Sequence, residues 1–227
     1  MLLHPKSKNR PFHLGPFPLE TLPRAPELAA AEAARPPVHR SMTSETDADG
    51  APSLLARASQ GYQALFQPFF DGEEALAVAP LPDDLTRRSM DVKGAAYFMD
   101  ASQVGVCAIP KRAWLIGTNP LEHTTAVVII VEHPRLPEPD NLAHGCAEEA
   151  VVATAEMRVA EVAAILAGHI RHMGFPATVH VRGEEAVDRE RLSVLSGLAV
   201  RRNGALVNPY LGGAYACAVV TTTYALA

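Results

Sequence analysis

Nine histidines and three cysteines are among the side chains of this sequence that could ligate a metal, transfer a proton or attack a substrate. Such chemistry needs several of these groups at a short, fixed spacing. His169 and His172 are three residues apart near the predicted end of a helix, where protonated imidazoles also favour the helix dipole. Their spacing favours helix capping or surface placement over metal binding, and no metal site is predicted.

The three cysteines, Cys107, Cys146 and Cys217, are far apart in the sequence and include no CxxC pair. Cys146 is the best nucleophile candidate, because it follows His144 just before a long predicted helix whose N-terminus favours a thiolate. Cys107 and Cys217 lie in apolar runs and are expected to fill space in the core. A dispersed, odd set gives no disulfide framework and no four-thiolate iron–sulfur cluster, which favours a reducing cytoplasm.

The segment Ser196–Gly213, SGLAVRRNGALVNPYLGG, is the most distinctive local pattern. It joins a predicted helix end to two arginines, an Asn-Gly turn and an Asn-Pro turn. Backbone amides and arginine side chains in such a segment can bind an amide-rich or phosphate-bearing ligand. The alternative is structural: Arg201 and Arg202 cap the helix, and Asn203-Gly204 turns a hairpin. The residues alone favour the structural alternative.

The elements that position these residues begin after an N-terminal arm. Nine of the 19 prolines lie in residues 1–52, which predicts a mostly extended or disordered arm, followed by a folded domain over residues 53–227. Within the arm, residues 10–24 interleave apolar side chains with prolines. This stretch could lie as an extended strap on the domain, and a solvated tail is the alternative.

Within residues 53–227, apolar periodicity predicts alternating helices and strands. The expected helices are 53–67, 90–102, 146–173 and 188–200, and the expected strands are 104–110, 124–134, 177–183, 205–208 and 214–226. This order favours an α+β fold or a three-layer sandwich around a central mixed sheet. A doubly wound nucleotide-binding fold is disfavoured, because neither GxGxxG nor GxxxxGK[ST] is present.

Charge and hydropathy exclude several classes of protein. The chain carries 20 Lys and Arg against 25 Asp and Glu, so its formal charge of -5 offers no broad basic surface for nucleic acid. No apolar stretch reaches the roughly 18 residues of a membrane-spanning helix. The first residues contain no secretion signal, which agrees with a cytoplasmic location.

A family resemblance follows from the order of three motifs in the last 32 residues. SGLAVRRNG, ALVNPYLGG and AVVTTTYAL resemble the corrinoid-binding core of reductive dehalogenases and epoxyqueuosine reductases. HPKSKNRPFHLGPFPLETL resembles the start of the catabolic, non-secreted reductive dehalogenases, and AAYFMDASQVGVCAIP resembles their helix-strand unit. The resemblance implies a nitroreductase-like or cobalamin-processing-like fold. It also implies six candidate cofactor-binding residues: Arg201, Arg202, Asn203, Gly204, Asn208 and Tyr210.

Departures from the family pattern imply that this chain is a degenerate copy. Ala199, Val200 and Arg201 stand where the family has glycines, and their side chains are expected to crowd a corrin ring. Thr222 or Thr223 replaces a later Asp, and the cysteine-rich cluster motifs are absent. In the family, an N-terminal copy of the corrinoid domain has lost its ligand and packs on the active copy. This chain resembles that N-terminal half.

We therefore expect a domain without its own cofactor and without an iron–sulfur cluster, acting as a scaffold for a corrinoid- and cluster-bearing catalytic part. The candidate residues would then be interface residues, and a homodimer is also compatible. One alternative is a stand-alone cobalamin- or flavin-binding reductase or cofactor-processing protein, and another is an unrelated binding domain. An interface role predicts an exposed apolar patch on the sheet or the long helix that is larger than the few hundred Å² usual for monomers.

Overall fold

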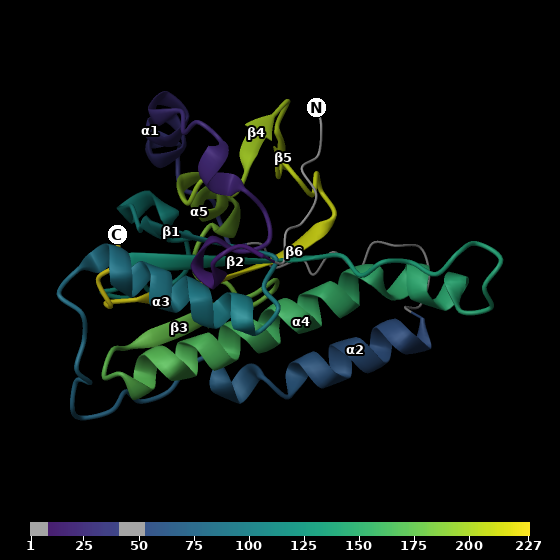
Figure 1. The fold of residues 1–227 in the computed structure, drawn as a ribbon, viewed down its shortest axis with the longest axis horizontal. Helices are drawn as coiled ribbons and strands as arrows, with labels where there is room; N and C mark the ends of the chain where they lie inside the picture. Colours follow the sequence, from purple (N-terminus) through teal and green to yellow (C-terminus); the bar gives the residue numbers. More distant parts are fainter. Residues whose placement is uncertain (1–8, 41–52) are drawn as a thin grey trace.

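The computed structural model of the chain describes residues 9–40 and 53–227. Four strands form one sheet in the order β1-β2-β6-β3, and two short strands, β4 and β5, form a separate hairpin (Figure 1). The strands are β1 (Gln103–Ala108), β2 (Thr125–Glu132), β3 (Ala177–His180), β4 (Val200–Arg202), β5 (Ala205–Val207) and β6 (Tyr215–Thr222). The helices are α1 (Pro26–Ala34), α2 (Leu54–Ala64), α3 (Leu85–Phe98), α4 (His144–His172) and α5 (Arg189–Leu195).

The central strand β2 lies between β1 and β6 and is buried over all but its last residue. Its side chains alternate between the two faces of the sheet, as the period of two in a β-strand requires. Val127, Ile129 and Val131 enter one apolar cluster, while Val128 and Ile130 enter another. The apolar run that predicted a strand covered on both faces is therefore confirmed.

The larger apolar cluster lies between the sheet and helices α3 and α4. The 29-residue helix α4 presents Val159, Leu166 and Ile170 to the sheet, and none of these side chains is exposed to solvent. Gly174 follows the helix with a φ of +90°, which favours glycine and ends α4. The predicted long helix is confirmed, although it begins at His144 rather than Cys146.

The other face of the sheet is covered by α5 and by the chain around Trp114, with Leu192 and Leu198 in the smaller apolar cluster. The Asp188 side chain caps α5 by accepting a hydrogen bond from the backbone N–H of Arg191 at 2.9 Å. The sequence predicted this cap. The helix ends at Leu195 instead of reaching Val200.

The N-terminal arm is more structured than the sequence predicted. Residues 26–34 form α1, whose alanines favour a helix and whose Pro26 sits at the first helical position. Before it, two short 3₁₀ turns, Phe12–Leu14 and Leu19–Thr21, pack on the domain. Residues 10–24 thus form the strap rather than a solvated tail. The predicted boundary between residues 52 and 53 stays a prediction, since residues 41–52 lie outside the described part.

Three other expectations were wrong. The sheet is entirely antiparallel and not mixed, because each of its three strand pairs runs in opposite directions. Residues 200–202 form strand β4, where a helix end was expected. The helix expected at 90–102 is α3, which begins at Leu85 after an Asp84 cap.

In residues 9–40 and 53–227, no helix combines the length and the apolar character needed to cross a membrane.

Candidate functional site

The segment singled out by the sequence, Ser196–Gly213, forms the β4–β5 hairpin and the turns on either side of it. Asn203 and Gly204 connect the two strands with φ values of +52° and +83°. Two successive residues with positive φ form the tight turn that a two-residue hairpin needs. The hairpin alternative is therefore confirmed, whereas Arg201 and Arg202 lie in β4 and do not cap the helix α5.

Arg201 connects the hairpin to both α1 and α5. Its Nε atom lies 3.1 Å from Oε2 of Glu32, which is buried on α1, and its Nη1 atom lies 3.0 Å from Oε2 of Glu190. Burial alone would lower the pKa of Arg201, but the hydrogen bond with Glu190 and the charge of Glu32 raise it above its ordinary value. This guanidinium is occupied by carboxylates of its own chain, whereas Arg202 is exposed.

Asn208 is buried and uses both ends of its side-chain amide. Its Nδ2 donates to Gln103 Oε1 at 2.5 Å and to the Leu198 carbonyl at 2.7 Å. Its Oδ1 accepts from the backbone N–H groups of Tyr210 and Leu211 at 2.9 and 3.0 Å. A side chain with these four bonds fixes the Asn-Pro turn and has little capacity left for a ligand.

Tyr210 points to the strap. Its hydroxyl donates to the Pro18 carbonyl at 2.9 Å, and its ring lies 5.3 Å from the ring of buried Phe17. The Arg24 side chain lies 3.5 Å from where a Cβ on Gly197 would be. Gly197 has a φ of +79°, which disfavours a side chain there. The strap therefore covers Tyr210 and Gly197, and the tip of the hairpin at Arg202 and Asn203 stays exposed.

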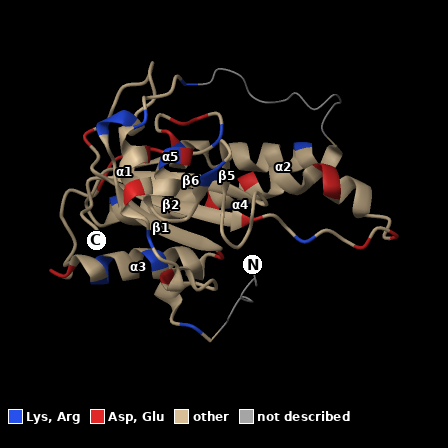
Figure 2. Cartoon of the chain, turned by 90° about the horizontal axis from the view of Figure 1, so that it is seen from above, with Lys and Arg blue, Asp and Glu red and all other residues tan. Residues whose placement is uncertain are grey.

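The charged groups that hold α1 on the domain were not predicted from the sequence. Arg191 has no exposed surface, and its guanidinium donates to the carbonyls of Arg112 and Pro36, the latter at 2.6 Å. Arg35 pairs with Asp188 at 2.5 Å. The blue and red segments around α1 and α5 in Figure 2 mark these charges. Arginine clusters usually indicate a surface, and only the fold shows that Arg191 is buried.

The cysteines lie on three different elements. Burial raises the pKa of the Cys107 thiol to about 12, and its Sγ donates to the Leu192 carbonyl at 3.7 Å. Burial also raises the pKa of Cys217, whose Sγ lies 3.4 Å from Ser193 Oγ. Both agree with the predicted core role. Cys146 is exposed in the first turn of α4, and its Sγ donates to the Ala143 carbonyl at 3.2 Å.

Two histidines that the sequence did not single out share a buried threonine. The backbone N–H of Ala186 donates to His180 Nδ1 at 3.2 Å, so Nε2 carries the proton and donates to Thr221 Oγ1 at 2.9 Å. The Thr221 hydroxyl is also hydrogen-bonded to His123 Nδ1 at 2.8 Å. Burial is the main cause that lowers the pKa of His180, to about 3. His180 therefore stays neutral, as a structural group.

No group of three or more His, Cys, Asp or Glu side chains in the described ranges is arranged to hold a metal. His169 and His172 lie in the last turn of α4, as expected for capping residues.

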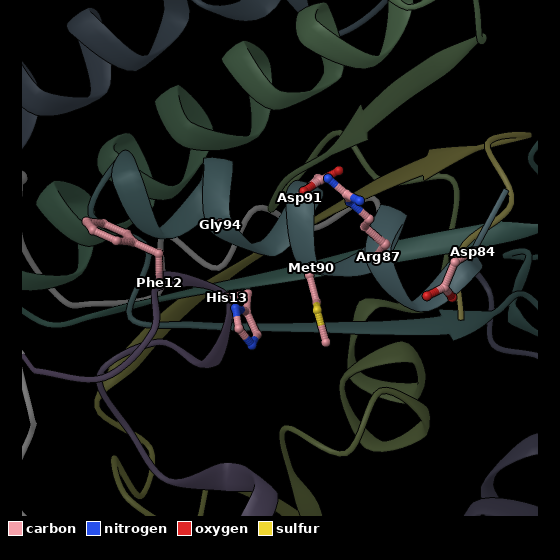
Figure 3. A pocket seen from close by; sticks show the side chains of 7 residues that line it. All are labelled: Phe12, His13, Asp84, Arg87, Met90, Asp91 and Gly94. Atoms are coloured by element: carbon pink, nitrogen blue, oxygen red, sulfur yellow. The ribbon is translucent and has the colours of Figure 1, made fainter. Parts of the chain in front are cut away.

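A surface cavity of about 530 Å³ lies between the strap and α3 (Figure 3). Phe12 and His13 line it from the strap, and α3 contributes Met90 and Gly94. Figure 3 shows the Arg87 and Asp91 side chains turned away from His13, toward the other side of α3. None of the six predicted cofactor-binding residues lines this cavity.

Comparison with solved structures identifies relatives of this architecture. The catabolic reductive dehalogenase NpRdhA matches over 98% of this chain with 38% sequence identity and a TM-score of 0.79. A structure described as suggesting a mechanism for B12-dependent dehalogenation matches over 100% of the chain, with 37% identity and a TM-score of 0.80. The chain belongs to the reductive dehalogenase family.

The chain spans only 31% of the length of these reductive dehalogenases. NpRdhA in complex with 3-bromo-4-hydroxybenzoic acid gives a similar match, with 39% identity, a TM-score of 0.79, and coverage of 96% of this chain and 30% of that one. An epoxyqueuosine reductase bound to a tRNA stem loop reaches 12% identity and a TM-score of 0.41, which is too low to support an argument. No protein-family model and no curated protein matches the chain.

Proposed function

We propose that this chain is the N-terminal, nitroreductase-like domain of the reductive dehalogenase type, that it binds no corrinoid or flavin of its own, and that it acts as a scaffold for a corrinoid- and cluster-bearing part. One observation carries the proposal. Two candidate side chains of the segment that resembles a corrinoid-binding motif, Arg201 and Tyr210, are bound by the chain's own N-terminal arm.

The contacts of the hairpin segment support the loss of a ligand site. Tyr210 binds Pro18, Arg201 binds Glu32, and Asn208 bonds to Gln103 and Leu198. A corrinoid would have to displace the strap and break an ion pair whose carboxylate is buried. Because Arg35 also pairs with Glu32, separating Arg201 from Glu32 costs less than the about 3–5 kcal/mol of a buried charge left without any partner, but it is still unfavourable. This cost favours an empty domain over a loaded one.

The scaffold role is supported by the partial match to longer relatives. They are about three times the length of this chain, so a domain of this type is joined in them to a larger remainder. The exposed tip of the β4–β5 hairpin, with Arg202 and Asn203, is the part of the segment left accessible. We assign the contact with the catalytic part to this tip. Cobalt chemistry on a halogenated aromatic would belong to that part.

Absorption spectroscopy tests the lack of a cofactor. The purified chain is dialysed against hydroxocobalamin and, separately, against FMN, and the visible spectrum of the retained protein is recorded. A colourless protein is expected in both cases. The matched variant Tyr210→Phe, which loosens the strap, should also stay colourless. Stoichiometric retention of either cofactor by the unaltered chain would overturn the proposal and favour a stand-alone reductase.

Co-expression tests the scaffold role. The part of NpRdhA outside the matched third is produced with and without this chain, and the yield of cofactor-loaded protein is measured. Recovery is expected only with the chain, and Arg202→Glu should reduce it, whereas Arg57→Glu on the distant helix α2 should not. Equal recovery with and without the chain would contradict the scaffold.

A further inference from the structure

The outer face of helix α2 is apolar and open to solvent. Ala56 and Ser59 are buried toward α4, while Leu54 and Leu65, on the opposite side of the helix, are 81% and 61% exposed. Ala58 and Gly61 lie between these leucines and are also exposed. No atom lies within 4 Å of a Cβ built on Gly61. Within the described residues, this face packs against nothing.

The apolar surface continues beyond α2 into the 3₁₀ turn Gln67–Phe69 and the loop before α3. In Figure 1 these segments follow one another along the lower edge of the molecule. We name this surface the α2 edge, and it contains the following exposed side chains: Leu54, Leu55, Tyr62, Leu65, Phe69, Leu76 and Val78. The sequence predicted such a patch on the sheet or the long helix, and it lies on the neighbouring helix instead.

The area of the α2 edge is close to what a stable interface needs. Each large apolar side chain contributes on the order of 100 Å², so together they expose roughly 700 Å². Patches on monomers usually measure a few hundred Å², and each partner of a standard interface contributes about 800 Å². Arg57 is the only charged residue from Leu54 to Phe69, and interface cores are likewise poor in charge. The exposed Asp71, Glu73 and Glu74 precede Leu76 in the loop, where they form the charged rim of the α2 edge.

The spacing along α2 identifies the occupant. Leu54 and Leu65 are equally distant from the middle of the helix, and so are Ala58 and Gly61. A two-fold axis near residues 59 and 60 therefore places Leu54 of one copy against Leu65 of the other. The small residues meet where the two antiparallel helices cross, which permits a short interaxial distance. We propose that the α2 edge is a dimer interface that binds a second copy of this chain.

The ends of the molecule agree with this symmetry. Leu76 and Leu142 are fully exposed and lie in the loop before α3 and the loop before α4. Figure 1 shows these loops at opposite ends of the long axis. An antiparallel pairing through α2 brings Leu76 of one copy to the same end as Leu142 of the other. The β4–β5 hairpin lies on the far side of the molecule, so dimerisation does not depend on the proposed scaffold role.

Sedimentation equilibrium of the full chain tests the interface. Between about 1 and 200 µM the chain should show a reversible monomer–dimer equilibrium, as expected for an interface slightly below standard size. Leu65→Glu should weaken dimerisation at least tenfold, because two carboxylates would enter the apolar contact. Phe98→Glu, at an exposed phenylalanine of α3, should leave it unchanged. A chain that stays monomeric at 200 µM would overturn the proposal and leave the α2 edge to a different protein.

Cysteine cross-linking tests the position of the two-fold axis. With the two-fold axis between residues 59 and 60, Ala58 of one copy lies opposite Gly61 of the other. The two Ala58 residues are therefore three residues apart, or about 4.5 Å, along the helix axis. In a Cys146→Ala background, Ala58→Cys should form a disulfide-linked dimer on oxidation. Gln60→Cys, exposed on the flank of the same helix, should remain monomeric. Equal cross-linking of both variants would rule out this arrangement even if a dimer forms.

Discussion

The two faces of the central sheet are closed in different ways. Helix α4 covers one face mostly with aliphatic side chains, among them Val159, Leu166 and Ile170, and buries only Glu156 and Arg171 as charged groups on this helix. The other face has a smaller apolar cluster, and around its edge Arg191, Asp188 and Glu32 are buried as charged groups. Apolar packing stabilises in proportion to area, whereas a buried ionic network adds little net stability and is sensitive to the loss of one member. We infer that α4 is stabilised mainly by the apolar area that it buries, and the N-terminal arm mainly by specific hydrogen bonds and ion pairs.

The largest expected effect comes from Arg191. Arg191→Ala removes the donor to the Arg112 and Pro36 carbonyls and leaves Asp188 with less compensation, so the free energy of unfolding should fall by about 3–5 kcal/mol. Urea denaturation measures this loss. Limited proteolysis should also cut the arm faster. Arg202→Ala, at an exposed arginine, should change stability by less than about 0.5 kcal/mol. If both arginine variants lost a similar free energy of unfolding, buried charges would not stabilise this face of the sheet in the way described.

On the aliphatic face, Leu166→Ala should lower the free energy of unfolding by about 3 kcal/mol through the cavity that it leaves. The arm should stay as resistant to protease as in the unaltered chain. The neighbouring Ile165 is 53% exposed, and Ile165→Ala is the matched control with a smaller expected loss. Faster cleavage of the arm in the Leu166 variant would show that the two faces are coupled.

Acid should destabilise the protein through His180. Its folded-state pKa of about 3 lies below the ordinary value of 6.5, so between these pH values the unfolded chain binds a proton that the folded chain does not. Stability should therefore fall as the pH decreases below about 6.5, by up to about 1.4 kcal/mol per pH unit. His180→Asn should flatten this slope in urea titrations at several pH values. An unchanged slope would mean that other groups cause it.

The smallest expected effect is at the strap. Tyr210→Phe removes the hydrogen bond to the Pro18 carbonyl but keeps the ring contact with Phe17, so the loss should be about 1 kcal/mol. Thermal and urea unfolding measure it. Tyr62→Phe, at a half-exposed tyrosine on α2, should be neutral. A loss as large as that of Arg191→Ala would mean that one hydrogen bond holds the whole strap.

Local patterns predicted the elements that are long and apolar. The strand Thr125–Glu132 was readable because burial on both faces leaves a continuous apolar run, and α4 was readable because burial of one face leaves a helical period. The Asn203-Gly204 turn was also readable, since its residue types are required by its backbone. What depends on neighbouring residues along the chain was therefore predictable.

Contacts between distant residues account for what the sequence missed. The helix α1 was missed because prolines flank it and because its partners, such as Asp188, lie about 150 residues away. The direction of the strands follows from pairing across the sheet, which no single run encodes. At the candidate site, the family resemblance implied a ligand contact for Tyr210, but only the fold shows that its hydroxyl is bound by the strap.

The bonds of Arg191 also constrain the order in which the chain can fold. Pro36 leaves the ribosome long before the guanidinium that binds its carbonyl, since 155 residues separate them. The part of the arm around α1 and Pro36 therefore cannot reach its final position until α5 has been made. An assembly partner that recognises α1 before it docks would find it only on newly made chains.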